Sequence, residues 1–357
     1  MLDIKQVLQD SGLTFLVSIP RLLNPRIHKH KQQRPVMTNS IQQIVSDDFE
    51  ALNKNVVSQL HSEVPLIENI GQYLIEAGGK RIRPLLALLC SRAFNYQGEQ
   101  HINLATVIEF LHTATLLHDD VVDMSEMRRG KPTANLQWGN PSSVLVGDFI
   151  YSRAFQLLVT IADMQIMEVM ATTTNKISEG EVLQLVNQHN VAATELDYMN
   201  VIHNKTAILF AAACSSAAIL ANTDSSVQEK LHTFGLEVGL AFQLIDDVLD
   251  YAGDSKELGK NIGDDLAEGK PTLPLIYVLQ HGNSDQKRLI SSAIKEGGLD
   301  HLDEIISVVR QSGALEYTRQ KAEERIAIAE ECLTVVPESP YKKGLELIAR
   351  KAIERSK

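Results

Sequence analysis

The chain has 357 residues, of which 44% are hydrophobic and 22% are charged, enough for one large globular domain or two ordinary ones. Its formal net charge of −11 argues against nucleic acid as a partner. The three cysteines are widely separated and in no metal-ligand spacing, which indicates free thiols in a reducing compartment, so we expect a cytoplasmic protein. No uninterrupted apolar run reaches the roughly 18 residues that a membrane-spanning helix needs.

Residues 1–36 differ in composition from the rest of the chain. They carry six Lys or Arg residues against two Asp, and Pro20, Pro25 and Pro35 prevent a long helix. We expect a dispensable or disordered N-terminal extension, with a basic arm for a membrane surface as the alternative. Residues 37–357 show no internal boundary or repeat and are predicted to form one domain.

From residue 41 onward, apolar residues recur with the period of a helix, and the alternation typical of strands is nearly absent. The longer predicted helices span residues 41–52, 64–75, 85–94, 104–127, 143–162, 169–185, 196–220 and 231–251. Shorter ones follow at 273–279, 287–294, 302–309, 317–333 and 341–353. Residues 132–141 and 253–274 are predicted loops. The sequence therefore indicates an all-α protein.

The first chemically distinctive segment lies between the second and third helices. Residues 78–84 read Gly-Gly-Lys-Arg-Ile-Arg-Pro, a flexible turn followed by three cations. Such a turn can surround an anion with backbone amides and basic side chains. The alternative is a solvent-exposed helix cap, but the segment directly precedes a strongly apolar helix.

A cluster of three aspartates lies near the end of the helix predicted over 104–127. Asp119 and Asp123 are four residues apart and share a helix face, with Asp120 beside them. Carboxylates that close repel one another unless a cation lies between them. Magnesium prefers oxygen ligands and leaves room for substrate phosphates, so it fits this arrangement best. Arg128 and Arg129 follow the cluster, and His112 lies two turns before Asp119 on the same face.

The same spacing returns in the helix predicted over 231–251, as Asp246, Asp247 and Asp250, with Gln243 one turn earlier. One copy could be a solvated acidic turn, but ionised carboxylates set twice into apolar helix surface need compensation. A lysine in an apolar helix, Lys205, likewise needs an anion or a route to solvent. The lysines of the 253–274 loop could close over phosphates as a lid. Together these features predict a site for metal and diphosphate.

These motifs identify the chain as similar to the trans-isoprenyl diphosphate synthases, and it most resembles the bacterial long-chain polyprenyl synthases, octaprenyl synthases in particular. The resemblance covers residue 40 to the end. It depends on motifs that occur in the family's order: residues 78–84, both aspartate motifs, Arg128-Arg129, Lys205-Thr206 and the Gly-Lys-Pro-Thr-Leu-Pro run at 269–274. It implies the isoprenoid synthase fold, roughly a dozen helices around a central cavity with both aspartate motifs at its mouth.

The resemblance also implies roles for the motif residues. Roughly two or three magnesium ions per active site would be bound by Asp119, Asp123 and Asp246. The catalytic set would be completed by Asp120, Asp247, Asp250 and Lys205. The pocket for isopentenyl diphosphate would be formed by Lys80, Arg83, His112 and Arg129. The contacts to the allylic diphosphate would be made by Arg128, Lys205, Thr206, Gln243, Lys260 and Lys270. A homodimer is implied as well, and a hydrophobic product could bring the enzyme into peripheral contact with a membrane.

Product length can be argued from the helix of the first motif, along which the growing tail must run. Ala114 and Thr115 leave the groove open where short-chain members of the family place bulky aromatic residues. The next candidates for a floor are Leu111 and Ile108. We therefore expect a long product, about eight isoprene units by resemblance, such as supplies the side chain of ubiquinone. A shorter-chain synthase, of geranylgeranyl or farnesyl type, is the alternative.

Two other kinds of protein share this fold. A terpene cyclase normally replaces the second aspartate motif and has no need for the basic segment at 78–84. A non-catalytic partner subunit of a prenyl synthase usually loses carboxylates, whereas this chain keeps all six. An unrelated helical protein with acidic turns would not explain the basic residues beside each cluster.

Overall fold

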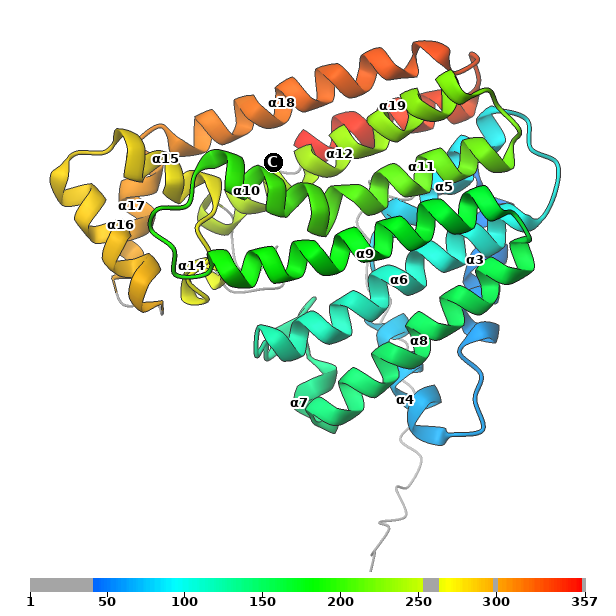
Figure 1. Ribbon diagram of the computed structural model, residues 1–357, viewed down its shortest axis with the longest axis horizontal. Coiled ribbons are helices and arrows are strands. Elements are labelled where there is room, and N and C mark those ends of the chain that lie inside the picture. The colour runs from blue at the N-terminus through cyan, green and yellow to red at the C-terminus, as the bar shows by residue number, and fades with distance from the viewer. Residues whose placement is uncertain (1–40, 253–262, 298–300, 355–357) are drawn as a thin grey trace, which may run out of the picture. The chain divides into compact units, whose positions relative to one another are not determined.

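The computed structural model describes residues 41–252, 263–297 and 301–354, which fold almost entirely into helices (Figure 1). The strands within these ranges are β1 (Met127–Arg128) and β2 (Lys131–Pro132), which pair antiparallel in one hairpin. The predicted all-α class is therefore confirmed. The prediction of an extension at residues 1–36 lies outside the described residues.

The first half of the domain consists of α3 (Ser46–Gln59), α4 (Pro65–Glu76), α5 (Ile82–Ala93), α6 (Gln100–Val122), α7 (Ala134–Trp138), α8 (Asn140–Ile161) and α9 (Met164–Asn187). The second half consists of α10 (Glu195–Ile202), the π-helical turn η1 (His203–Ala207), α11 (Ile208–Leu220), α12 (Ser225–Ala252), α14 (Asp264–Ala267), α15 (Leu273–His281), α16 (Ser284–Glu296), α17 (Leu302–Gln311), α18 (Ala314–Cys332), the short 3-10 helix η2 (Leu333–Val335) and α19 (Pro340–Ile353).

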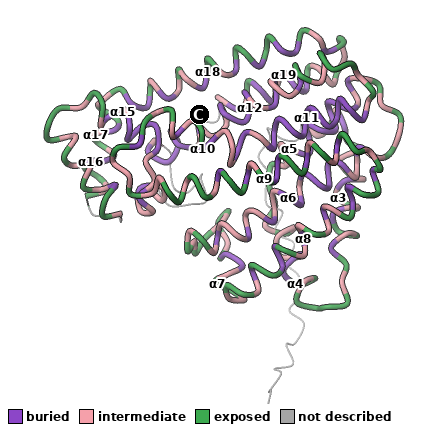
Figure 2. Tube along the Cα trace, in the orientation of Figure 1, coloured by how far each residue is buried: buried purple, intermediate pink, exposed green. Residues whose placement is uncertain are grey.

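Helix α11 lies at the centre of the core. Every residue from Leu209 to Leu220 is buried, and the helix packs against α5, α6, α9 and α12 (Figures 1 and 2). A Cβ atom at Gly235 of α12 would lie 2.3 Å from the carbonyl oxygen of Phe210, so this glycine lets the two backbones touch. The helices that carry the two aspartate motifs, α6 and α12, therefore both pack against the apolar helix α11.

Helix α19 closes the domain against its beginning. It packs on α5, whose residues from Pro84 to Ser91 are all buried. A Cβ atom at Gly344 would approach Leu89 to 2.9 Å, so the two helices touch closely at this point. Helices from opposite ends of the chain therefore share one core.

The structure corrects several predicted elements: α3 continues to Gln59 rather than ending at 52, and the predicted 253–274 loop contains α14. Helix α6 ends at Val122 rather than at 127, because the amides of Met124 and Ser125 turn back to the carbonyls of Val121 and Asp120. This C-terminal motif usually carries glycine at the left-handed position, but here Met124 occupies it with φ of 51°. The predicted 132–141 loop contains α7, and the predicted 196–220 helix is interrupted by η1.

Helix α8 is long and apolar enough to cross a membrane by length and composition alone. Asp148 and Arg153 interrupt its apolar residues, so the helix contains no uninterrupted apolar run of roughly 18 residues. Core helices of globular proteins meet the same two criteria. In this structure α8 packs along α6, and 39% of its most apolar 18-residue stretch is buried.

A partly buried ion cluster joins three helices of the first half. Asp48 of α3 accepts hydrogen bonds from Arg92 of α5, at 2.6 and 2.7 Å, and contacts His101 of α6 at 2.9 Å. Burial alone would raise the pKa of the Asp48 carboxyl, but the hydrogen bonds from Arg92 and His101 outweigh it and hold this pKa well below its ordinary value.

We expect Asp48→Asn to lower the free energy of unfolding by about 2–3 kcal/mol at neutral pH, because the charged hydrogen bonds are lost. A carboxyl whose pKa is depressed by folding stabilises the protein above its unfolded pKa, near 3.9, and loses this effect as pH falls further. Denaturant unfolding at several pH values should therefore show the difference from wild type shrinking below about pH 4. The neighbouring Asp47→Asn is the control and should change stability by less than about 0.5 kcal/mol. A difference that stays constant with pH would contradict the ion-pair account.

Candidate active site

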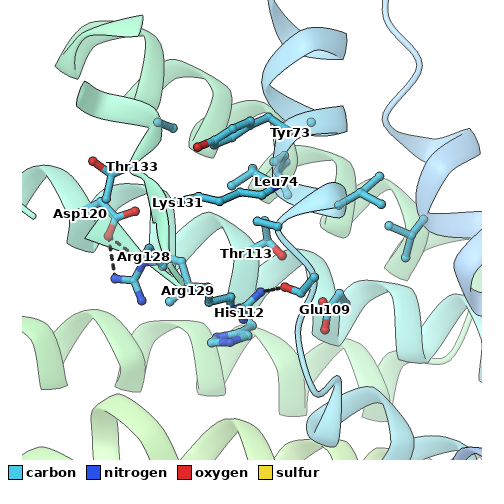
Figure 3. Close-up of a pocket in the computed structure, with 18 of the residues that line it drawn as sticks. Tyr73, Leu74, Glu109, His112, Thr113, Asp120, Arg128, Arg129, Lys131 and Thr133 are labelled. Carbon is cyan, nitrogen blue, oxygen red and sulfur yellow. Dashed lines mark hydrogen bonds and ion pairs between the residues drawn. The ribbon is translucent and has the colours of Figure 1, made fainter. Parts of the chain in front are cut away.

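The first aspartate motif lies at the end of α6, under the hairpin. Asp120 is buried, and one of its carboxylate oxygens accepts hydrogen bonds from two nitrogens of Arg128, at 2.6 and 2.7 Å (Figure 3). Burial raises the pKa of Asp120, and the hydrogen bonds and charge of Arg128 oppose that rise. Because α6 ends at Val122, the chain folds back and brings Arg128 onto its own helix end.

The other two carboxylates of this motif face cations from distant parts of the chain. The amide of Asp123 donates to the carbonyl of Asp119, so the two side chains lie one turn apart, as the spacing predicts. Lys205 Nζ lies 3.9 Å from Asp119 Oδ2, and Lys270 Nζ lies 3.1 Å from Asp123 Oδ2. Burial raises the pKa of Asp119, Lys205 opposes the rise, and Asp123 adds to it. Lys270 also pairs with Glu268.

The second motif lies on α12 and is ordered by hydrogen bonds from two neighbouring elements. Tyr198 of α10 donates its hydroxyl to Asp247 Oδ2 at 2.7 Å, and Gln243 donates its amide to Asp247 Oδ1 at 2.9 Å. Thr206 donates to Gln243 Oε1 at 3.1 Å. Asp250 is fully buried. Burial lowers the pKa of Arg83, and the charge of Asp246 is one of those that oppose this fall.

The π-helical turn η1 connects the two motifs. Its consecutive residues lie beside different motifs: Lys205 Nζ is 3.9 Å from Asp119 Oδ2, and Thr206 donates a hydrogen bond to Gln243. Single π turns within helices are frequent at functional sites because the wider turn reorients side chains. Both aspartate motifs thus border the same region of the structure.

A cavity of about 570 Å³ opens beside η1 and gathers much of the predicted allylic side. Five predicted residues line it: Lys205, Thr206, Gln243, Asp247 and Lys270. Tyr198 and Gln184 also line it, and neither was predicted as a site residue. Asp265, from the predicted lid loop, lines it as well. Tyr198 lies two helical turns before Lys205, so that spacing was the available signal.

A second cavity, of about 790 Å³, is lined in part by the hairpin and is shown in Figure 3. Four predicted residues line it: His112, Asp120, Arg128 and Arg129. Arg128 therefore borders this cavity rather than the one that gathers the allylic side. Arg83 lies beside it, with Nη1 3.2 Å from His112 Nε2 and its guanidinium 4.4 Å from the centre of the Phe210 ring.

The electrostatics of this cavity favour an anion. Burial lowers the pKa of His112 well below its ordinary value, and the nearby Arg83, Arg129 and Arg128 lower it further, so the imidazole stays neutral. Burial also lowers the pKa of Arg83 to about 10, although Glu109 opposes the change. Among the described residues, Arg83 Nε and Arg81 Nη1 are buried donors with no hydrogen-bond partner. Unpaired buried donors of this kind are costly unless a ligand satisfies them.

Glu109 is the counter-charge of this cavity and was not predicted as a site residue. Its carboxylate lies 3.8 Å from Arg81, both side chains are largely buried, and its charge acts on Arg83 and Arg129 (Figure 3). It lies one helical turn before His112, which is the pattern that could have pointed to it. The negative charge of this one carboxylate therefore acts on three arginines.

Some predicted residues lie elsewhere. Lys80 is exposed on the 78–84 turn, and Lys260 lies outside the described residues. Ala114, Leu111 and Ile108 are at most 1% exposed within the core, and the hydroxyl of the half-buried Thr115 donates to the carbonyl of His112. These four residues do not line either cavity in the described part of the chain. The predicted roles of all these residues stay predictions.

The donor chemistry fits magnesium. Among the described residues, no three His, Cys, Asp or Glu side chains converge closely enough to bind an ion by themselves. Magnesium is usually held by one or two carboxylates, with substrate phosphates and water supplying the remaining ligands. The half-buried Asp119 and Asp123, one turn apart and faced by lysines, offer that kind of incomplete oxygen set.

Comparisons with known proteins identify the family of the chain. The family model for polyprenyl synthetases matches residues 64–310. The chain is 48% identical to the octaprenyl diphosphate synthase of Escherichia coli K12, over 89% of this chain and 98% of the relative. It is 46% identical to a geranyl-diphosphate-specific all-trans-nonaprenyl-diphosphate synthase of Rhodobacter capsulatus, over 87% and 96% of the two chains.

Similarity extends to solved structures. The polyprenyl synthase from Caulobacter crescentus CB15, complexed with calcium and isoprenyl diphosphate, superposes with a TM-score of 0.87 at 39% identity, over 90% of this chain and 98% of that one. The expected fold around the two motifs is therefore confirmed.

We expect Glu109→Gln to lower the melting temperature, because the repulsion among Arg81, Arg83 and Arg129 loses its counter-charge. Inorganic diphosphate should then raise the melting temperature of this variant by more than it raises that of wild type, since the anion supplies the missing charge. Thermal melting with and without diphosphate measures both effects. Glu99→Gln, which neutralises an exposed carboxylate just before α6, should behave like wild type. An equal or smaller diphosphate shift in Glu109→Gln would contradict the assigned role.

Proposed function

This chain belongs to the polyprenyl synthetase family and is a long-chain trans-polyprenyl diphosphate synthase, a prenyltransferase, and on that premise we propose that it makes octaprenyl diphosphate. The substrates would be isopentenyl diphosphate and an allylic primer, farnesyl diphosphate, and the product would supply a quinone side chain. The octaprenyl synthase of Escherichia coli at 48% identity supports this length. The similarity to the nonaprenyl synthase of Rhodobacter capsulatus makes nonaprenyl diphosphate the alternative product.

The observation that carries the proposal is the position of η1 between the two aspartate motifs. Lys205 faces Asp119 of the first motif, and Thr206 is linked through Gln243 to Asp247 of the second. A diphosphate bound among these residues would meet cations and hydrogen-bond donors from three elements at once. Such preorganised charge is most effective where negative charge develops on a leaving group.

The protein's own residues would act by binding and positioning. Arg83, Arg81 and Arg129 would hold the diphosphate of isopentenyl diphosphate in the cavity of Figure 3, with neutral His112 fixing Arg83. Lys205 and Lys270 would receive the allylic diphosphate as its carbon–oxygen bond breaks. The double bond of isopentenyl diphosphate would then attack the allylic cation, and a proton would leave toward the departing diphosphate. No side-chain nucleophile is needed.

We propose that magnesium is held by Asp119 and Asp123 on one side and Asp246 on the other, with Asp120, Asp247 and Asp250 in support. When bound, the metal would neutralise the allylic diphosphate and make it a better leaving group. The Caulobacter relative, solved with calcium and isoprenyl diphosphate, supports a divalent cation at a site of this kind.

We further propose a cytoplasmic homodimer. All three cysteines are free and buried, in keeping with a reducing compartment. Large apolar side chains are exposed along α8 and α9, among them Leu145 at 66%, Val159 at 68% and Val186 at 70% (Figure 2). Several exposed apolar side chains on two consecutive helices are typical of a protein interface, and a second copy of the chain would cover them.

We expect the purified protein, with magnesium, labelled isopentenyl diphosphate and farnesyl diphosphate, to give a ladder of products ending near eight isoprene units. Product chromatography measures the end point. Termination at about nine units, or activity only with geranyl diphosphate as primer, would favour the nonaprenyl assignment. The absence of any elongation with metal present would leave the non-catalytic partner subunit.

The role of α6 in product length is tested by enlarging one of its side chains and reducing another. We expect Ala114→Phe to end the ladder several units earlier, because a bulky ring would close the groove one turn before the motif. Leu111→Ala should leave the end point unchanged or extend it. The rate of the first condensation and the thermal melt serve as controls for folding, since a buried Phe can overpack the core. Unchanged length in a folded Ala114→Phe would contradict the groove along α6.

The oligomeric state is tested by sedimentation velocity. Wild type should sediment as a dimer, and Val159→Glu should shift it toward the monomer, because a buried unpaired charge opposes association. Val57→Glu, at an apolar residue 52% exposed on α3, is the matched control and should remain dimeric. A wild-type monomer at micromolar concentration would refute the homodimer.

A further inference from the structure

Glu181 is a carboxylate that the two aspartate motifs do not account for. It lies on α9, and its Oε2 atom is 2.6 Å from Lys205 Nζ. The same ammonium group is 3.9 Å from Asp119 Oδ2. The three side chains are between 16% and 30% exposed, so water screens these charges only in part. Lys205 is therefore shared unequally between a motif aspartate and a glutamate outside the motif.

The position of Glu181 is fixed by backbone contact. A Cβ atom at the preceding residue, Gly180, would lie 2.5 Å from the backbone nitrogen of Lys205 and 2.8 Å from the carbonyl carbon of Asn204. Only glycine allows α9 to approach η1 this closely. The wide π turn of η1 in turn presents Lys205 toward α9. The carboxylate and the ammonium group are thus brought together by the path of the main chain.

We propose that Glu181 is a positioning residue that draws Lys205 away from Asp119 and so leaves Asp119 available to the metal ion. This inference rests on the proposed function, in which Asp119 binds magnesium. At 2.6 Å the lysine makes a charge-assisted hydrogen bond to Glu181, whereas at 3.9 Å it makes none to Asp119.

Lys205 and a divalent metal ion would compete for the carboxylate of Asp119. An ammonium group beside two carboxylates pairs with the closer and better oriented one. Without the charge of Glu181, Asp119 would be the nearest anion, and Lys205 would close the gap. A divalent ion would then have to displace the lysine before it could reach Asp119. With Glu181 present, the lysine is held at the side of the cavity, from which it can still reach a diphosphate.

The test is a double-mutant cycle on metal affinity, measured by equilibrium dialysis of Mn²⁺ in a fixed concentration of inorganic diphosphate. The four proteins are wild type, Glu181→Gln, Lys205→Met and the double variant. We expect Glu181→Gln to weaken Mn²⁺ binding roughly tenfold, the size of effect seen when a residue that orients a metal ligand is removed. In the Lys205→Met background the same change should matter less than about twofold, because the competing lysine is gone.

The controls separate this role from a structural one. Glu179→Gln removes an exposed carboxylate two residues away on α9, one that pairs with Lys176, and it should bind Mn²⁺ like wild type. Each variant is checked by thermal melting. An equal loss of affinity in both backgrounds would overturn the inference, because Glu181 would then act on the metal directly. An unchanged affinity in Glu181→Gln would overturn it as well. If wild type itself retains no Mn²⁺ in diphosphate, the proposed metal-dependent function fails, and the inference fails with it.

Discussion

The need to compensate carboxylates set into an apolar helical core shapes the whole site. Burial penalises the charged forms of Asp119 and Asp120, so each requires a cation close by. The chain supplies these cations from a hairpin, a π turn and the segment before α15, which are distant in sequence. The fold around the motifs can be understood as the arrangement that delivers three positive charges to the end of one helix.

The same pairs prepare the site for its ligands. In the ligand-free arrangement Arg128 pairs with Asp120 and Lys270 pairs with Asp123, whereas Lys205 pairs with Glu181 rather than with Asp119. In the complex that we propose, Lys205 and Lys270 would turn to diphosphate oxygens while metal ions bind Asp119 and Asp123. The rigid contacts of α11 with α12 and of α9 with η1 keep the participating groups at fixed distances while partners change.

Much of this could be predicted from the sequence because the information is local. Helical periodicity, the i, i+4 spacing of the aspartates and the basic segment at 78–84 depend on neighbours in the chain. The end of α6 at Val122 could not be predicted, since Met124 occupies the left-handed position that is usually glycine in this C-terminal motif. Glu109 and Glu181 are single carboxylates on amphipathic helices, and only tertiary packing brings them beside Arg81 and Lys205. The π turn likewise leaves no pattern in composition or period.

The contact between α5 and α19 also matters during synthesis. The ribosome makes the two helices about 250 residues apart, which at roughly 5–20 residues per second is an interval of about 12–50 seconds. Throughout that interval the apolar surface of α5 that α19 will cover, including Leu89, has no permanent partner. The nascent chain therefore exposes this part of α5 until α19 has been made, and apolar surface exposed in this way favours aggregation.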